Sequence, residues 1–298
     1  MYESKEQILL YHGYALGCGG FMERDGTKIP IDAIAPGVIS IVGGRCRTEQ
    51  PEWEFKLPAK GKYPKFFIRV SKAVTEVVSS EDDTQWTTTA YSTVHGLNLC
   101  DVIRADRVTS KLTSVHLKRK KGQKKKEACI SFAGSEIRGL SVNGVPCGVT
   151  IDQELDRFQT HGELKGVLSG KLGPKARPDF SALACKLWSE QFKPRNLLEA
   201  VKKDKKKAPL YMQDMVDKFV SDGTTRCSII ADLNIPPETK AVKYGYSIEI
   251  EGFGRIFFGE MRVSDGMKRL DMIRFDLGCD DCGGGTIPSS AVNGEPVP

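Results

Sequence analysis

The chain has 298 residues, of which 40% are hydrophobic, which is enough to bury the core of one large domain or two smaller ones. No stretch approaches the roughly 18 consecutive apolar residues of a membrane-spanning helix. Residues 1–6 lack the basic and apolar regions of a secretory signal. We therefore expect a cytoplasmic protein that does not span a membrane.

The net charge of +6 is unevenly distributed along the chain. Two lysine-rich clusters, residues 118–126 and 202–207, hold the excess, and the remainder has more acidic than basic residues. The pattern indicates a mildly acidic body with two basic appendages.

Nine cysteines are scattered through the chain. An odd number without dense spacing is typical of reduced cytosolic thiols and not of a disulfide framework. We expect most of them to be small buried side chains.

The N-terminal third is predicted to consist of strands and loops. Residues 8–22 are rich in glycine and aromatics, which favours a strand whose backbone lies close to another. A phosphate-binding loop is not indicated, because no GxxxxGK[ST] motif occurs. Residues 50–64 are predicted to form a loop, and residues 66–70 and 73–78 to form strands.

Residues 91–147 carry the clearest strand signals. Apolar and polar residues alternate through residues 93–99 and again through 130–132, and residues 108–117 are rich in strand formers. Asn143-Gly144 predicts a two-residue turn, because both residues tolerate positive φ.

A basic cluster interrupts these strands and predicts a hairpin tip that is too charged to be buried. It could bind nucleic acid or another acidic surface, or it could be a solvated tip that prevents aggregation. Because the tip has no aromatic residues, stacking on bases is not supported. The candidate polyanion-binding residues are Lys118, Arg119, Lys120, Lys121, Lys124, Lys125 and Lys126.

Residues 151–222 differ in pattern from the rest of the chain. Apolar residues recur at helical spacing in residues 152–168, and three further helices are predicted before residue 222. The lysine run at 202–207 fits a charged helix end. The sequence therefore predicts a helical insertion within a β-rich chain, and strands are predicted to resume after Thr224.

Near the C-terminus, Cys279 and Cys282 form a CxxC pair flanked by glycines. A structural zinc site needs four ligands, and no second pair is present. A thioredoxin-like role would place the motif at the start of a helix. These two cysteines are weak metal candidates, and a turn with two ordinary thiols is favoured.

A sequence echo links the middle of the chain to its end. Residues 134–137 and 141–146 resemble residues 284–287 and 291–296, and both copies contain Val-Asn-Gly-x-Pro. The echo indicates either a duplicated β unit or a coincidence between two turn sequences. Farther upstream, residues 270–275 align with residues 112–117 only when a gap is allowed.

The runs at residues 92–99, 105–110 and 134–146 resemble a loosely defined set of β-rich bacterial proteins of the choice-of-anchor type. The resemblance covers less than a fifth of the chain and rests on strand and turn residues. It implies a β-rich surface or structural protein with no assigned reaction. This chain departs from the group because it shows no export signal or anchor and carries a helical segment.

Together these patterns predict a mainly β fold, sandwich-like or two-sheet (α+β overall), with a helical insertion around residues 151–222. The β-rich halves are residues 1–150 and 223–298, and the second is expected to pack with the first. No catalytic constellation and no cofactor motif are found. We expect a non-enzymatic structural or interaction protein that self-assembles. Its expected partners are proteins, including its own copies. The alternative is an accessory protein that binds nucleic acid or another polyanion through its lysine clusters.

Overall fold

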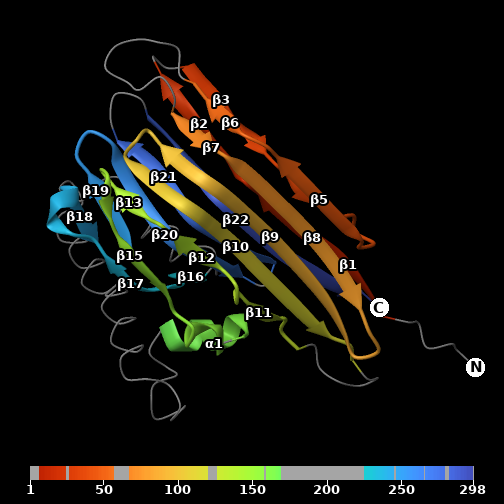
Figure 1. Cartoon of the computed structure of the whole chain (residues 1–298). Coiled ribbons are helices and arrows are strands. Elements are labelled where there is room, and N and C mark those ends of the chain that lie inside the picture. The colour runs from red at the N-terminus through yellow and green to blue at the C-terminus, as the bar shows by residue number, and fades with distance from the viewer. Residues whose placement is uncertain are drawn as a thin grey trace, which may run out of the picture.

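The computed structural model describes residues 7–24, 27–56, 67–119, 126–157, 159–168, 225–244, 246–264, 266–278 and 282–297. Most of these residues lie in strands, which form two large antiparallel sheets and one small sheet (Figure 1). The prediction of a mainly β, two-sheet fold is confirmed. Among the described residues, no helix is long and apolar enough to cross a membrane.

The first sheet joins the two ends of the described chain, because β1 pairs along its length with β22. Its order is β18-β19-β20-β21-β22-β1-β4, with β16 on β20 and the β2–β3 pair on β22. Its strands are β1 (Ile8–Leu16), β2 (Cys18–Arg24), β3 (Thr27–Ile34), β4 (Gly37–Val38), β16 (Thr225–Ser228), β18 (Ala241–Tyr244), β19 (Ser247–Ile250), β20 (Gly254–Ser264), β21 (Met267–Gly278) and β22 (Cys282–Val297).

The second sheet is built around the long β9–β10 hairpin. Its order is β14-β13-β10-β9-β7-β6; β11 and β12 also pair with β10, and β8 carries β5 beside β9. Its strands are β5 (Arg45–Gln50), β6 (Trp53–Phe55), β7 (Ile68–Val70), β8 (Lys72–Glu81), β9 (Gln85–Leu99), β10 (Ile103–Leu117), β11 (Cys129–Ser131), β12 (Glu136–Arg138), β13 (Ser141–Val142) and β14 (Val145–Pro146).

The loop prediction for residues 50–64 was partly wrong, because Trp53–Phe55 forms β6. This strand pairs with β7, and the Trp53 and Phe55 rings stack with centroids 6.2 Å apart. Sheet pairing and aromatic packing stabilise a short strand that the flanking prolines obscured. Residues 57–64 lie outside the described residues.

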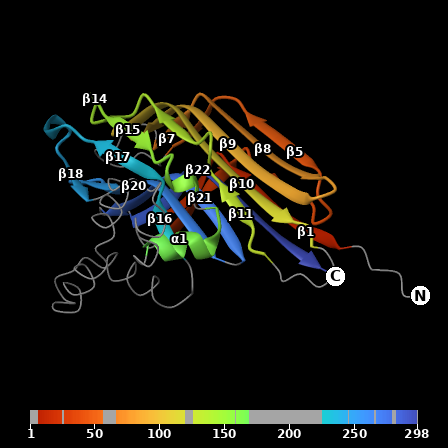
Figure 2. The same ribbon diagram turned by 90° about the horizontal axis from the view of Figure 1, so that it is seen from below.

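The two sheets pack face to face through β1 and β22 of the first and β8, β9 and β10 of the second (Figure 2). Large apolar side chains such as Trp86, Phe258 and Phe275 are fully buried. Buried hydroxyls also join the layers: the Ser110 hydroxyl lies 2.6 Å from the Ser290 hydroxyl, and the Ser92 hydroxyl donates to the Leu16 carbonyl at 2.8 Å. The interior between the sheets is therefore partly polar, with each of these hydroxyls partnered.

Glycines allow the close approach that the sequence predicted for residues 8–22. A Cβ at Gly13 would lie 2.4 Å from a methyl carbon of Val77 on the opposite sheet. A Cβ at Gly20 would lie 2.3 Å from the Gly284 carbonyl oxygen. Any side chain at these two positions would force neighbouring strands apart.

The predicted insertion begins after β15 (Gly148–Ile151), which pairs with β17 (Ile230–Asn234) in the small sheet. The expected helix over 152–168 is split into the 3₁₀ turn η1 (Leu155–Arg157) and the helix α1 (His161–Leu168). Two separate caps explain the split. The Asp152 carboxylate accepts the Leu155 N–H at 3.1 Å, and the Thr160 hydroxyl accepts the Glu163 N–H at 3.2 Å.

The other predicted helices, in residues 169–222, lie outside the described residues, as does the lysine run at 202–207. The 3₁₀ turn η2 (Pro237–Thr239) follows β17. The domain boundaries stay a prediction. The first sheet combines N-terminal and C-terminal strands.

The sequence echo occupies matching places in two three-stranded meanders. In β9–β10–β12/β13, Ile137 pairs with Val108 and Ser141 with Arg104. In β20–β21–β22, Ile287 pairs with Ile273 and Ala291 with Arg269. These equal registers favour the duplicated β unit.

The same registers correct the upstream alignment, in which Leu270 was matched with Leu112. Arg104 pairs with Ser141 and Arg269 with Ala291, so these two arginines occupy equivalent places. Leu270 therefore corresponds to Ala105. The upstream alignment therefore had the wrong register along β10, and the corrected match still requires a gap before the echo.

Candidate anion-binding site at the base of the basic loop

The basic cluster lies where the sequence predicted it, in the connection between the antiparallel strands β10 and β11. Lys118, Arg119 and Lys126 are described, whereas Lys120, Lys121, Lys124 and Lys125 lie outside the described residues. The described residues thus form the base of a loop, called here the basic loop (residues 118–126).

Lys118 fixes one end of the basic loop. Its ammonium lies 2.7 Å from a Glu81 carboxylate oxygen and 5.3 Å from the centre of the Trp86 ring. The hydrogen bond from Lys118 lowers the pKa of Glu81 below its ordinary value. Arg119 adds a backbone N–H that donates to the Gln7 side-chain oxygen at 3.2 Å. Lys118 is therefore partnered within the fold.

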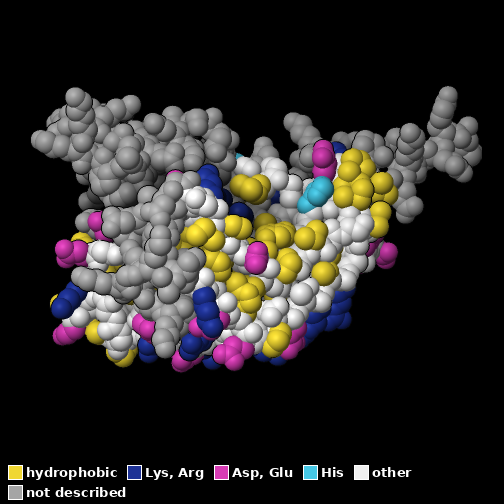
Figure 3. Space-filling view, turned by 90° about the horizontal axis from the view of Figure 1, so that it is seen from above, with side chains coloured by type: hydrophobic (Ala, Val, Ile, Leu, Met, Phe, Trp, Pro, Cys, Tyr) yellow, Lys and Arg dark blue, Asp and Glu magenta, His cyan; other side chains and the backbone are white. Residues whose placement is uncertain are grey.

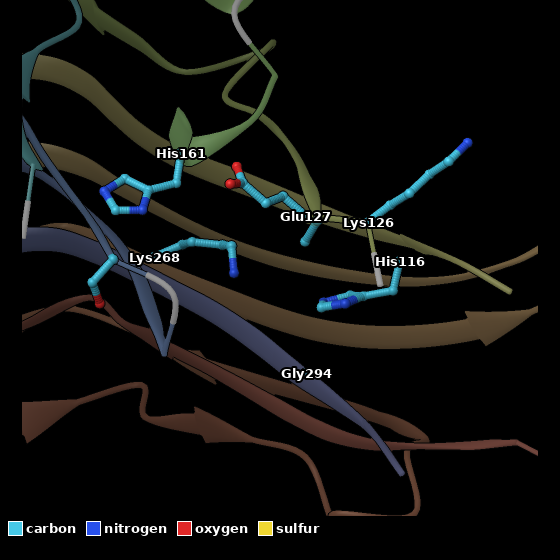
Figure 4. A pocket seen from close by; sticks show the side chains of 8 residues that line it. His116, Lys126, Glu127, His161, Lys268 and Gly294 are labelled. Carbon is cyan, nitrogen blue, oxygen red and sulfur yellow. The ribbon is translucent and has the colours of Figure 1, made fainter. Parts of the chain in front are cut away.

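At the other end of the basic loop, five elements enclose a pocket with a volume of about 250 Å³ (Figure 4). The lining comes from the end of β10, the residues before β11, the start of α1, the β20–β21 turn and β22. Among the described lining residues, five side chains are ionisable. The lining residues are His116, Lys126, Glu127, Ala128, His161, Ser264, Lys268 and Gly294.

His116 enters the pocket from β10 and is only 6% exposed. Its Nε2 lies 3.2 Å from the Ser114 hydroxyl, with roles that depend on the tautomer. A Cβ at Gly294 would lie 3.0 Å from the same Nε2, closer than side chains normally pack. The glycine on β22 therefore makes room for the imidazole.

Lys268 enters from β21 and is only 4% exposed. Its ammonium donates to the Asn293 side-chain oxygen at 3.3 Å, and the Asn293 amide group donates to the Gly266 carbonyl. Asn293 thus holds the lysine stem against the β20–β21 turn. In Figure 4 the Lys268 ammonium and the His116 ring point toward one another.

Glu127 and His161 form another side of the pocket. A Glu127 carboxylate oxygen accepts the Gly162 N–H at 2.8 Å, in the first turn of α1. The positive end of the helix partly offsets the charge of this carboxylate. Figure 4 shows the Glu127 carboxylate turned toward the side of His161, whereas Lys126 extends away from the other side chains. Lys126 therefore contributes to the rim.

The arrangement is suited to binding an anion. Among the described lining residues, two lysines and two histidines stand beside one carboxylate, and that carboxylate already accepts a helix N–H. Lysine and protonated histidine are donors to oxyanions, and such charge-assisted bonds are strong where water is partly excluded. A neighbouring hollow of about 240 Å³, on the side of His12 and Tyr14, also includes Lys268.

The sequence-predicted metal candidates fall largely outside the part of the chain that the structure describes. Cys279 lies outside the described residues, and Cys282 begins β22 opposite Gly278. Within the described ranges, no group of three or more His, Cys, Asp and Glu side chains could hold a metal ion. The zinc hypothesis stays a prediction.

Sequence reasoning missed the pocket itself and expected no pocket chemistry. Of its lining, only Lys126 was predicted to bind an anion, whereas His116, Glu127, His161 and Lys268 were not. One signal was available: Asn293-Gly294, noted as part of the echo, contacts the buried side chains of Lys268 and His116.

Comparison with known proteins identifies the family to which the chain belongs. Neither the search of curated proteins nor the search of solved structures returns a match. The resemblance to choice-of-anchor proteins stays a prediction, since the matching family model carries no such description. That model, described as a domain of unknown function (DUF8256), matches residues 9–264, most of the chain. The chain therefore belongs to the DUF8256 family.

Proposed function

We propose that the protein is a non-enzymatic interaction protein that binds a polyanion, such as a nucleic acid, at the basic loop. One observation carries this proposal: the buried side chains of Lys268 and His116 meet in a pocket at the base of that loop. Lys118, Arg119 and Lys126, the described residues of that loop, lie at the same end of the second sheet.

The electrostatic argument has two parts. Exposed lysines attract phosphates over several ångströms and release counterions on binding, which makes affinity fall with salt. The pocket adds donors in fixed positions, which a solvated lysine tip does not have. A tip that served only to prevent aggregation would need no such pocket beneath it.

The test compares charge reversals of equal size. K120E/K121E and K124E/K125E each reverse the charge of two loop lysines. The control K28E/K240E reverses the charge of two exposed lysines, one in β3 of the first sheet and one directly after η2. Binding of a short single-stranded DNA is followed by fluorescence anisotropy at several salt concentrations. We expect each loop variant to weaken binding by about tenfold or more and to reduce the salt dependence by about 0.7 per lost phosphate contact.

The control is expected to bind nearly as the parent protein does. Equal losses in the loop variants and the control would show that binding follows net charge alone, and the proposed site would be wrong. An unchanged affinity in both loop variants would reject the polyanion function.

Self-association is the second candidate, and exposed apolar residues beside β4 favour it. Val38, Ile41 and Val42 are 59%, 54% and 81% exposed. Figure 3 shows hydrophobic side chains across the middle of the face seen from above, with basic and acidic side chains along its lower margin. Exposed apolar side chains that gather on a surface mark interaction sites in many proteins.

The edge strands of the two sheets favour self-association less. Edge strands β4 and β14 have two residues each, and β3 and β14 contain Pro30 and Pro146. Edge strand β5 carries Arg45 and Arg47, which pair with Glu76. Short, charged and proline-containing edges resist pairing with another sheet. Light scattering that returns a monomer for the parent protein, or no difference between the parent and V42D, would reject self-association through this segment.

A further inference from the structure

We infer that the pocket binds one phosphate-sized oxyanion, and that the oxyanion is a phosphate monoester or free phosphate and not an internal phosphodiester. Where the phosphate belongs to a polymer, this inference rests on the proposed function and means that the protein recognises a phosphorylated end.

Size is the first argument. A volume of about 250 Å³ is below the range of about 300 to 1,000 Å³ for pockets that bury a drug-sized ligand. A phosphate group with a few waters fits this volume, since one water occupies roughly 30 Å³. An internal phosphodiester carries a sugar on each side, so both sugars would have to lie outside this volume.

Direction is the second argument. His116 comes from β10, Lys268 from β21 and His161 from the start of α1, so potential donors reach the pocket from three elements. A tetrahedral oxyanion has acceptor oxygens in several directions and can bond to all three. A monoester or free phosphate presents three or more terminal oxygens, whereas a diester presents only two.

Pre-organisation is the third argument. The ammonium of Lys268 is held by Asn293, and the space for His116 depends on Gly294. Both side chains are more than nine-tenths buried, so little side-chain entropy remains to be lost on binding. Positions fixed in this way suit a small ligand with a defined shape better than a flexible chain.

The experiment titrates inorganic phosphate by calorimetry and compares three DNA strands of one sequence, with a 5′-phosphate, with a 3′-phosphate and with neither. The main variant is K268M, which keeps the apolar stem and removes the charge. The matched control is K243M, because the Lys243 ammonium also donates to a neutral oxygen, the Leu233 carbonyl. K268R tests whether a positive charge rescues binding.

We expect inorganic phosphate to bind the parent protein and K243M alike. K268M should lose between about tenfold and a hundredfold in affinity, the range for one hydrogen bond to a charged group. K268R should recover part of that loss, and thermal melting should show that K268M remains folded. A phosphorylated strand should bind more tightly than the unphosphorylated strand, and K268M should abolish that difference.

The outcomes separate the two proposals. If K268M binds inorganic phosphate as the parent does, or if no phosphate binds, the inference is overturned. If DNA binding depends on the basic loop but not on a terminal phosphate, the proposed function stands and end recognition is wrong. If phosphate binds through Lys268 but no DNA binds, the pocket is a site for free phosphate and the polyanion function fails.

Discussion

The two Val-Asn-Gly segments have the same sequence and the same place in their meanders, but they adopt different backbones. Asn143 and Gly144 have φ values of 50° and 79° and form the turn between β13 and β14, as the sequence predicted. Asn293 and Gly294 lie inside β22, where they pair with His12 and Tyr11 of β1. A strong local turn signal was thus overridden at the second site.

The presence of a partner strand explains the difference. The third strand of the C-terminal meander lies beside β1, which offers backbone hydrogen bonds along nine residue pairs from Ile8 to Leu16. Residues 141–146 instead fold back on themselves, with Val142 paired to Val145. Asn-Gly permits a turn, but the free energy of pairing with a long neighbouring strand decides whether one forms.

The two asparagine side chains also have different roles. The Asn143 amide group donates to the Thr239 carbonyl at 2.7 Å, which ties the turn to η2. Asn293 instead contacts Lys268 and the β20–β21 turn. One copy therefore stabilises the fold, whereas the other builds the pocket.

The largest expected effect concerns the equivalent arginines, Arg104 and Arg269. Arg269 donates at 3.0 Å to Asp271, which is fully buried, whereas Arg104 pairs with the exposed Asp101. R269A should lower the free energy of unfolding by about 3 kcal/mol, because it removes a partner of a buried carboxylate. R104A should cost less than about 1 kcal/mol. Urea unfolding measures both, and equal losses would contradict the difference in burial.

Next in size is the substitution of each asparagine by valine. N143V should cost about 2 to 3 kcal/mol, since a β-branched residue is strained at positive φ and the bond to Thr239 is lost. N293V should cost about 1 kcal/mol, because valine suits a strand and only side-chain bonds are lost. A larger loss of stability in N293V would show that the pocket contacts stabilise the fold more than the turn does.

The glycines give a smaller effect that separates stability from binding. G144A should cost about 1 kcal/mol through strain at positive φ, with no neighbour within 4 Å to clash, and should leave phosphate binding unchanged. G294A should cost a similar ~1 kcal/mol through overpacking against Leu9 and His116, and should also weaken phosphate binding. Calorimetric titration beside urea unfolding tests both variants. Normal binding by G294A would contradict the assigned role of His116.

The smallest expected change in stability comes from breaking the ion pair between Lys118, which follows β10, and Glu81. The pKa of Glu81 is lowered in the folded protein, so the pair stabilises the fold above the ordinary carboxyl pKa of about 4.3 and loses this contribution as pH falls through the folded pKa. E81Q should therefore lower Tm slightly at pH 7 and not at pH 3. A difference that persists in acid would assign the effect to packing.

Much of the fold could be predicted because alternation is a local property. The period of two in residues 93–99 marks β9, and the Asn143-Gly144 turn follows from two residues. The pairing of sheets is not local: the serines at 92, 110 and 290 resemble solvent-facing residues in sequence, yet they are fully buried between the layers.

The site was harder to predict for the same reason. His116, His161, Lys268 and Gly294 are distant in sequence and line one pocket only because β10 packs over β22 and α1 lies beside Glu127, just before β11. Each of them alone is an ordinary strand or helix residue. The basic loop was visible in the sequence because its charge is contiguous, whereas the pocket beneath it required the tertiary structure.

The buried hydroxyls between the sheets affect how the stability of the protein depends on temperature. Where Ser110 meets Ser290 and Ser92 meets the Leu16 carbonyl, unfolding exposes polar groups and less hydrocarbon than a fully apolar interior would. Polar exposure lowers the heat-capacity change of unfolding, and apolar exposure raises it. The heat-capacity change per residue should therefore fall below the usual ~12–15 cal/mol/K, and stability should vary less steeply on warming and cooling.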